Sequence, residues 1–243
     1  MATKLKVKTI EPATGTTLSL GNPDDAVTIS SDSIKVNTWK DSGNNTLWTS
    51  DGSGAITSIN SGLAGGGYTL IGSAHTASNA ASIEITSGID STYDEYVFVM
   101  TDMFPHTNGE NMRVTFSTNG GTGYGLTKTG TWFRARHTEG GASGDLAYDG
   151  SYDVAQSTDP QNLDYSTGGD ADQSYAGILH LFAPSNTTYV KHYYATGNVS
   201  MADDTSQNIF VAGYINTTTA VNAVKFLFSS GNISGTIQMY GIA

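Results

Sequence analysis

The strongest constraint on the fold is the run of residues after Gly67, where apolar and polar residues alternate in one short segment after another. Val, Ile, Phe and Tyr dominate these segments, and turns such as NGG, EGG and SGN separate them. A period of two places alternate side chains on opposite faces of a strand. About ten such segments without a convincing helix predict an all-β domain over residues 68–243, a β-sandwich or jelly-roll-like fold.

Two further segments of this domain follow from the same pattern. The stretch AHTASNAAS has no 3.6-residue apolar period, so it is interpreted as strand or loop. The last residues keep Ile237, Met239 and Ile242 at strand-like positions. We therefore expect the C-terminal segment to belong to a sheet, and its removal to be harmful.

The first 62 residues show a weaker form of the pattern. Their apolar residues come in small alternating pairs separated by turn sequences: Leu5/Val7, Leu18/Leu20, Val27/Ile29 and Ile34/Val36. Burying two such side chains contributes roughly 3 to 6 kcal/mol, whereas ordering about five residues costs roughly 5 to 10 kcal/mol. These strands should not be stable alone, so we expect an extended region in which identical segments of a homotrimer intertwine.

A hairpin and a linker complete this region. Trp39 and Trp48 flank the turn sequence DSGNN, as the two strands of a hairpin would. The glycine-rich segment that follows predicts a linker at residues 63–67. The expected organisation is an oligomerising docking region at 1–62, the linker, and a β-sandwich domain at 68–243.

Charge and composition exclude several functions. The net charge of -11 disfavours nucleic acid as a partner, because phosphate binding requires a basic face. Cysteine is absent, so neither a disulfide framework nor a cysteine-ligated metal is available. The apolar runs are far shorter than the roughly 20 residues that span a bilayer, and lysines interrupt any leader-like stretch. We expect no membrane insertion.

The opening MATKLKVKTIEP is basic in an otherwise acidic chain. Its lysines alternate with apolar residues, which is the pattern of an extended strand that adds to a neighbouring surface. We interpret it as a docking arm for an acidic neighbour, with the contacts made by Lys4, Leu5, Lys6, Val7 and Lys8.

The segment TWFRARHTEGG combines aromatic rings with guanidinium groups, which can bind a sugar by stacking and bidentate hydrogen bonds. The candidate glycan contacts are Trp132, Arg134, Tyr148 and Tyr152. The alternative is an ordinary half-buried strand, with Trp132, Arg134 and Arg136 on one face and Phe133, Ala135 and His137 on the other.

Other candidate sites have weaker patterns. Seven aspartates lie between Asp145 and Asp172, but no complete Ca²⁺-binding loop motif accompanies them, so a solvated acidic loop is favoured over a cation site. The five histidines are scattered without metal-ligand spacing. No catalytic motif is present, and a Ser/His/Asp triad or a carboxylate pair for glycoside cleavage stays open. We expect no cofactor, no metal and no enzymatic activity.

Three segments resemble structural proteins of tailed bacteriophages, especially those of marine phages: KLKVKTIEPATGTTLSLG, TLWTSDGSGAITSIN and GTIQMYGIA. The resemblance is to fibre and head-decoration proteins. It implies a trimeric appendage on the virion surface, with the N-terminal part attached to a capsid or tail protein and the β domain pointing outward.

Three functions follow as expectations. The first is a structural virion protein, either a fibre or a capsid decoration protein. The second is a lectin-like module that binds a host surface glycan. The third is a polysaccharide depolymerase, which would require two carboxylates in a groove.

Overall fold

Antiparallel strands make up every regular element of the described chain. The computed structural model describes residues 38–41, 43–53, 55–59 and 67–242. The chain divides into two compact units, Met1–Leu63 and Ala64–Ala243. The docking residues 4–8 and most of the predicted linker lie outside the described residues. Within the described ranges, no helix is long and apolar enough to cross a membrane.

The first unit contains a three-stranded antiparallel sheet of β1 (Thr38–Lys40), β2 (Thr46–Ser50) and β3 (Ile56–Ile59). Trp39 is opposite Trp48 in the register, and their rings stack with centroids 6.3 Å apart. The Asp41 carboxylate accepts hydrogen bonds from the backbone N–H of Asn45 at 2.8 Å and Gly43 at 2.9 Å, which closes the turn. The predicted tryptophan hairpin is confirmed.

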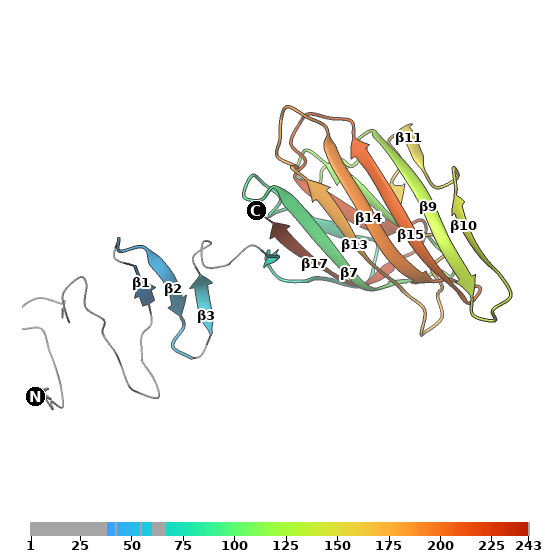
Figure 1. Ribbon diagram of the computed structural model, residues 1–243, viewed down its shortest axis with the longest axis horizontal. Helices are drawn as coiled ribbons and strands as arrows, with labels where there is room; N and C mark the ends of the chain where they lie inside the picture. The colour runs from blue at the N-terminus through green and yellow to red at the C-terminus, as the bar shows by residue number, and fades with distance from the viewer. Residues whose placement is uncertain (1–37, 42, 54, 60–66, 243) are drawn as a thin grey trace, which may run out of the picture. The chain divides into compact units, whose positions relative to one another are not determined.

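The second unit is built on a ten-stranded sheet, whose strands lie side by side in Figure 1. Its main order is β10 (Gly144–Tyr148), β9 (Lys128–Thr138), β15 (Thr205–Ile215), β14 (Lys191–Ser200), β13 (Tyr175–Phe182), β7 (Glu95–Pro105), β17 (Ile233–Ile242) and β4 (Thr69–Leu70). Two short strands pair off this path: β11 (Val154–Ser157) with β9, and β5 (His75–Ala80) with β17.

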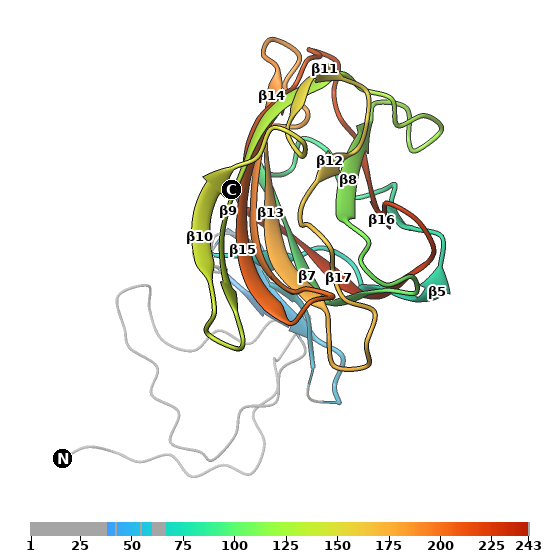
Figure 2. The ribbon, with the colours of Figure 1, turned by 90° about the vertical axis from the view of Figure 1, so that its right-hand side faces the viewer.

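A four-stranded sheet forms the second layer of this unit. Its order is β12 (Gln161–Asn162), β8 (Met112–Ser117), β16 (Ala223–Phe228) and β6 (Ile83–Ile85). Figure 2 shows this layer facing one side of the larger sheet, while the described residues of the second unit form no layer on its other side. We call the covered side of the large sheet its inner face and the other side its outer face.

The core lies between the two sheets. The ring of Phe98 on β7 is 5.7 Å from that of Phe226 on β16, and Phe116 on β8 is 5.3 Å from Tyr193 on β14, measured between centroids. All four side chains are at most 2% exposed. The all-β, sandwich-type fold predicted for this part of the chain is confirmed.

The last strand is paired on both sides within the large sheet. β17 pairs with β7 on one side and with β4 and β5 on the other, and Ile237 and Met239 are at most 2% exposed. Gly235 lies in a bulge with a φ of 132°, where an added Cβ would approach the Asp102 carbonyl oxygen to 2.7 Å. The predicted burial of the C-terminal segment is confirmed, and AHTASNAAS, interpreted as strand or loop, contains strand β5.

Candidate functional site

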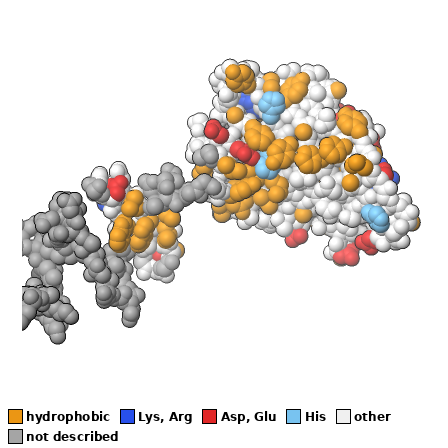
Figure 3. Space-filling view, viewed as in Figure 1, with side chains coloured by type: hydrophobic (Ala, Val, Ile, Leu, Met, Phe, Trp, Pro, Cys, Tyr) orange, Lys and Arg blue, Asp and Glu red, His pale blue; other side chains and the backbone are white. Residues whose placement is uncertain are grey.

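The outer face of the large sheet carries a row of aromatic rings. Phe133 on β9 is opposite Phe210 on β15, with stacked rings 5.4 Å apart. Phe210 stacks with Tyr194 on β14 at 6.2 Å, and Tyr194 stacks with His180 on β13 at 4.3 Å. The ring of Phe182 on β13 lies on the same face, with its centroid 5.8 Å from that of Tyr194. These five residues are called the aromatic band, and Figure 3 shows hydrophobic side chains in a row across this face.

Two more positions extend the aromatic band toward the sheet edges. Tyr148 on β10 is opposite Phe133 and is 60% exposed. At the other end, Val97 of β7 is opposite both His180 and Tyr240 of β17. Residues directly opposite one another on neighbouring strands share a face of the sheet. Aromatic side chains therefore lie on the outer face of β10, β9, β15, β14 and β13 and again on β17, with the buried Val97 of β7 between His180 and Tyr240.

Strand alternation explains why these rings point outward. On β15, Ile209 and Val211 are fully buried, and Phe210 between them is 38% exposed. Phe133 is likewise exposed by 41% next to the fully buried Trp132. Each ring of the aromatic band therefore occupies the outward position of a strand whose inward positions form the core.

The outer face around the aromatic band is almost free of charge. Strands β9, β15, β14, β13 and β17 contain no Asp or Glu. Their basic residues are on the inner side: Lys128 and Lys191 are fully buried, and Arg134 and Arg136 share the parity of Trp132. The ionisable groups that remain on the outward positions of these five strands are histidines and tyrosines.

A carboxylate at the end of β7 contacts the aromatic band. Glu95 Oε1 and His180 Nδ1 are 2.5 Å apart, and the His180 ring stacks on Tyr194. Burial, and secondly the charge of Glu95, raise the pKa of Tyr194 above its ordinary value. The Tyr194 hydroxyl therefore stays protonated at neutral pH and is able to donate a hydrogen bond.

A hollow of about 570 Å³ adjoins the aromatic band at Phe182. Its wall includes the apolar side chains of Phe182 and Tyr189, together with the polar side chains of His192 and Thr218. The loop at its rim is ordered by Asn186, whose Oδ1 accepts hydrogen bonds from the backbone N–H of Thr188 and Tyr189 at 2.7 and 2.9 Å.

Buried Lys191 supports the same loop from below. Its Nζ donates hydrogen bonds to the carbonyl oxygens of Asn186, of Tyr189 at 3.0 Å and of Thr217 at 3.4 Å. Three carbonyl acceptors replace the water that a buried ammonium group loses. The wall of the hollow therefore stands on a rigid, hydrogen-bonded base.

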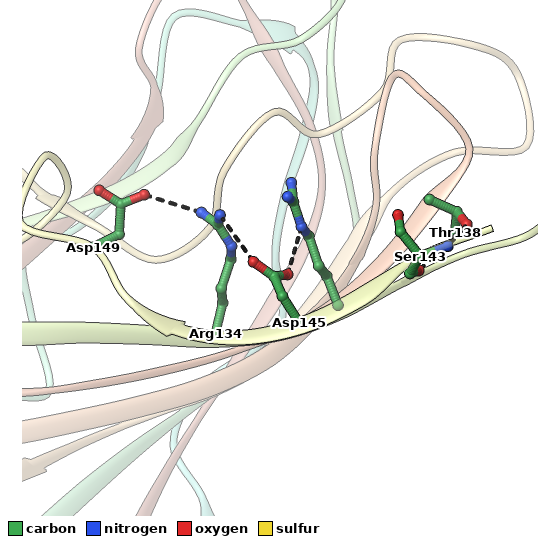
Figure 4. Close-up of polar contacts among 6 residues, drawn as sticks. Arg134, Thr138, Ser143, Asp145 and Asp149 are labelled. Atoms are coloured by element: carbon green, nitrogen blue, oxygen red, sulfur yellow. Dashed lines mark hydrogen bonds and ion pairs between the residues drawn. The ribbon is translucent and has the colours of Figure 1, made fainter. Parts of the chain in front are cut away.

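The inner face of β9 carries an ion-pair network, shown in Figure 4. The Arg134 guanidinium bonds the Asp149 carboxylate at 3.0 Å and lies 3.6 Å from that of Asp145. Asp145 also accepts a 2.6 Å hydrogen bond from Arg136 Nε. The side chain of Arg134 is 12% exposed and is held by acidic partners of its own chain, so this cluster is an internal support for β10.

The four candidate glycan contacts do not form one surface. Trp132 is fully buried, with its ring 5.0 Å from that of Tyr152, which corrects its expected place at a binding surface. Arg134 lies on the same inner face, as alternation predicted, but Tyr148 points to the outer face opposite Phe133. The structure therefore separates Tyr148 from the other three.

The aspartates of residues 145–172 serve different local roles. Asp153 accepts a hydrogen bond from the hydroxyl of Tyr148, and Asp149 pairs with Arg134. Asp164 is fully buried and accepts hydrogen bonds from Met112 N–H at 2.6 Å and from the Thr167 hydroxyl, so the idea of a wholly solvated acidic loop is wrong at this position. Among the described residues, no group of three or more His, Cys, Asp or Glu side chains could hold a metal ion.

The second candidate surface is the three-stranded sheet of the first unit. None of its strand residues is buried, and Trp39, Ile56 and Ile59 are 42%, 59% and 49% exposed. The predicted docking residues Lys4, Leu5, Lys6, Val7 and Lys8 lie outside the described residues.

No family model matches the chain, and no curated protein or solved structure matches it. The function must therefore be inferred from the residues of the chain itself.

Sequence reasoning missed the central residues of the aromatic band. Tyr194 and Phe210 each lie in a strand segment that alternation identifies, and their outward parity is readable from the sequence. The sequence does not indicate that their strands, β14 and β15, are neighbours in the sheet.

Proposed function

We propose that this chain is a structural protein of a bacteriophage virion, a homotrimeric fibre or capsid decoration protein. The observation that carries the proposal is the three-stranded sheet of β1, β2 and β3, which has three exposed large apolar side chains and no buried residue in its strands. The resemblance of the three segments quoted above to phage structural proteins supports the same assignment.

The energetics of this sheet favour assembly. Its strands have three, five and four residues, and fixing the backbone of each residue costs about 1 to 2 kcal/mol. Its described side chains are all partly or largely exposed, so little hydrophobic free energy offsets that cost. Companion copies that cover Trp39, Ile56 and Ile59 would supply the missing burial.

The sandwich of the second unit has the opposite property, because its two sheets enclose a core of their own. Such a domain is suited to display on the particle surface. In this arrangement residues 1–62 hold three copies together and attach them to a capsid or tail protein, and residues 68–243 point outward.

The stoichiometry of the purified full chain tests the proposal. Light scattering coupled to size exclusion should give three times the 25.5 kDa of one chain. The double variant Ile56→Ser, Ile59→Ser should shift the protein toward monomer. Leu146→Ser, at a 76% exposed residue of the second unit, is the matched control and should remain a trimer. A monomeric wild type in which residues 38–59 are protected from hydrogen exchange would refute the proposal.

Particle incorporation tests the docking arm separately. Replacing Lys4, Lys6 and Lys8 by glutamate reverses the charge that we expect to face an acidic neighbour. Incorporation should be lost while the trimer persists. Normal incorporation of this variant would exclude the arm as the attachment point.

A further inference from the structure

We infer that the aromatic band and the hollow beside it bind a neutral saccharide chain. This binding site goes beyond the proposed structural role and does not depend on it. It also differs from the glycan contacts expected around Trp132, because Trp132 is buried and the aromatic band lies on the opposite face.

The first step is the exposure of the rings. Phe133 and Phe210 form a stacked pair with about two fifths of each side chain in water. Their neighbours on the outer face are small or polar, such as Ala212 and Thr196. The partly buried rings of Tyr194, His180 and Phe182 continue the row from this exposed pair. Apolar surface gathered in this way on one face marks a binding surface. The C–H-bearing faces of pyranose rings pack well on aromatic side chains.

The second step is the set of hydrogen-bonding groups beside the rings. The protonated Tyr194 hydroxyl and the Glu95–His180 pair lie within the aromatic band. At its far end, the Tyr240 hydroxyl donates to Gln238 at 2.9 Å on the same face. Sugar hydroxyls both donate and accept, so they match a mixed set of this kind.

The third step is charge. Single-stranded nucleic acid also stacks on rows of rings, but it requires a basic groove along its backbone. All Lys and Arg side chains of strands β9, β15, β14, β13 and β17 are on the inner side, and Lys128 and Lys191 are fully buried. Strand β7, which lies between β13 and β17, contains no Lys or Arg. An anionic polymer would find no partner on these strands. A neutral ligand fits.

The fourth step is shape. Protein partners bury about 800 Å² on each side through a broad apolar centre. The aromatic band is instead a row with one ring each on β9, β15 and β14 and two rings on β13. It leads at Phe182 to a hollow of about 570 Å³, within the usual size range of small-ligand pockets. A chain of linked sugar rings, with one sugar unit or branch in the hollow, fits this shape better than a flat protein surface does.

Affinity electrophoresis of the full chain tests the inference. The native gels contain a neutral polysaccharide, namely laminarin, mannan, dextran or agarose-derived galactan, or the anionic alginate as a comparison. At least one neutral polysaccharide should retard the wild type. Phe210→Ser and Tyr194→Ser should each raise the dissociation constant at least tenfold, about 1.4 kcal/mol. The control Leu146→Ser removes a more exposed apolar side chain of the same face and should change it less than twofold.

Phe210→Leu distinguishes lost binding from misfolding, because it keeps an apolar side chain on β15 and removes only the aromatic ring. It should lose binding while its melting temperature stays close to that of the wild type. Retardation by none of the neutral polysaccharides, by alginate alone, or equally in the wild type and Phe210→Leu would overturn the inference. If Phe210→Leu instead changes the stoichiometry in light scattering, the aromatic band is an interface between copies and the saccharide inference fails. The proposed trimer is tested by light scattering of the Ile56→Ser, Ile59→Ser variant, whereas the saccharide site is tested by electrophoresis of the aromatic-band variants. Either proposal can therefore fail while the other holds.

Discussion

The three-stranded sheet of residues 38–59 and the ten-stranded sheet of the second unit both consist of antiparallel strands, yet among the described residues only the ten-stranded sheet has a second layer over one face. In the first sheet Trp39 and Trp48 stack on each other and Trp39 stays 42% exposed. In the second, Phe98 packs against Phe226 of the opposite sheet and both are fully buried. Alternation therefore specifies a strand, whereas stability requires a second surface.

The largest expected effect comes from removing one strand of the better-covered sheet. Deleting residues 233–243 removes β17, which pairs with three other strands and buries Ile237 and Met239. The lost contacts should exceed the 5 to 15 kcal/mol of a typical domain, so cooperative unfolding should disappear in calorimetry. Deleting residues 1–63 is the comparison and should leave the sandwich transition in place. A sandwich that melts normally without β17 would contradict the assigned topology.

Single substitutions in the two units should show the same difference, with smaller effects on the free energy of unfolding. Phe226→Ala leaves a cavity between the two sheets and should cost about 3 to 5 kcal/mol of unfolding free energy. Trp39→Ala removes a larger but exposed ring from the first unit and should change the unfolding of the sandwich by less than about 0.5 kcal/mol. Chemical denaturation followed by far-UV circular dichroism measures both. Equal losses would mean that the two units unfold together.

The pKa values of two aspartates are shifted in opposite directions. Hydrogen bonds from Asn45 lower the pKa of the exposed Asp41 below its ordinary value. Burial raises the pKa of Asp164 to about 7. The unfolded chain loses the Asp164 proton near the ordinary pKa of about 4, whereas the folded chain keeps it up to about pH 7. The free energy of unfolding of the sandwich should therefore fall as the pH rises from about 4 to about 7.

Asp164→Asn checks this dependence, because the amide can still accept from Met112 N–H and can donate to the Thr167 hydroxyl. The variant should lose the fall in stability, which we expect to be on the order of 1 to 4 kcal/mol, in melts at pH 4.5 and pH 8. Asp41→Asn is the control from the first unit and should leave the pH dependence of the sandwich unchanged. An identical pH profile for wild type and Asp164→Asn would exclude a raised pKa at this residue.

Parts of the candidate site were readable from the sequence and parts were not. Alternation placed Trp132 and Arg134 on one face and Phe133 on the other, and the structure agrees. It did not say which face the second sheet covers, so Trp132 was expected at a surface and is instead in the core. The pairing of Tyr148 opposite Phe133 depends on the register of a hairpin, which the sequence did not specify.

The sequence by itself determined that this chain forms strands, that Trp39 and Trp48 meet in a hairpin, and that the final segment joins a sheet. Those properties depend on residues close together in the chain, through strand alternation and turn chemistry. Only the tertiary structure decided that β9, β15, β14 and β13 are neighbours, and so that Phe133, Phe210, Tyr194 and His180 form one row. Strand order and layering depend on contacts between segments far apart in sequence, and the alternation within one strand is the same whichever strand lies beside it.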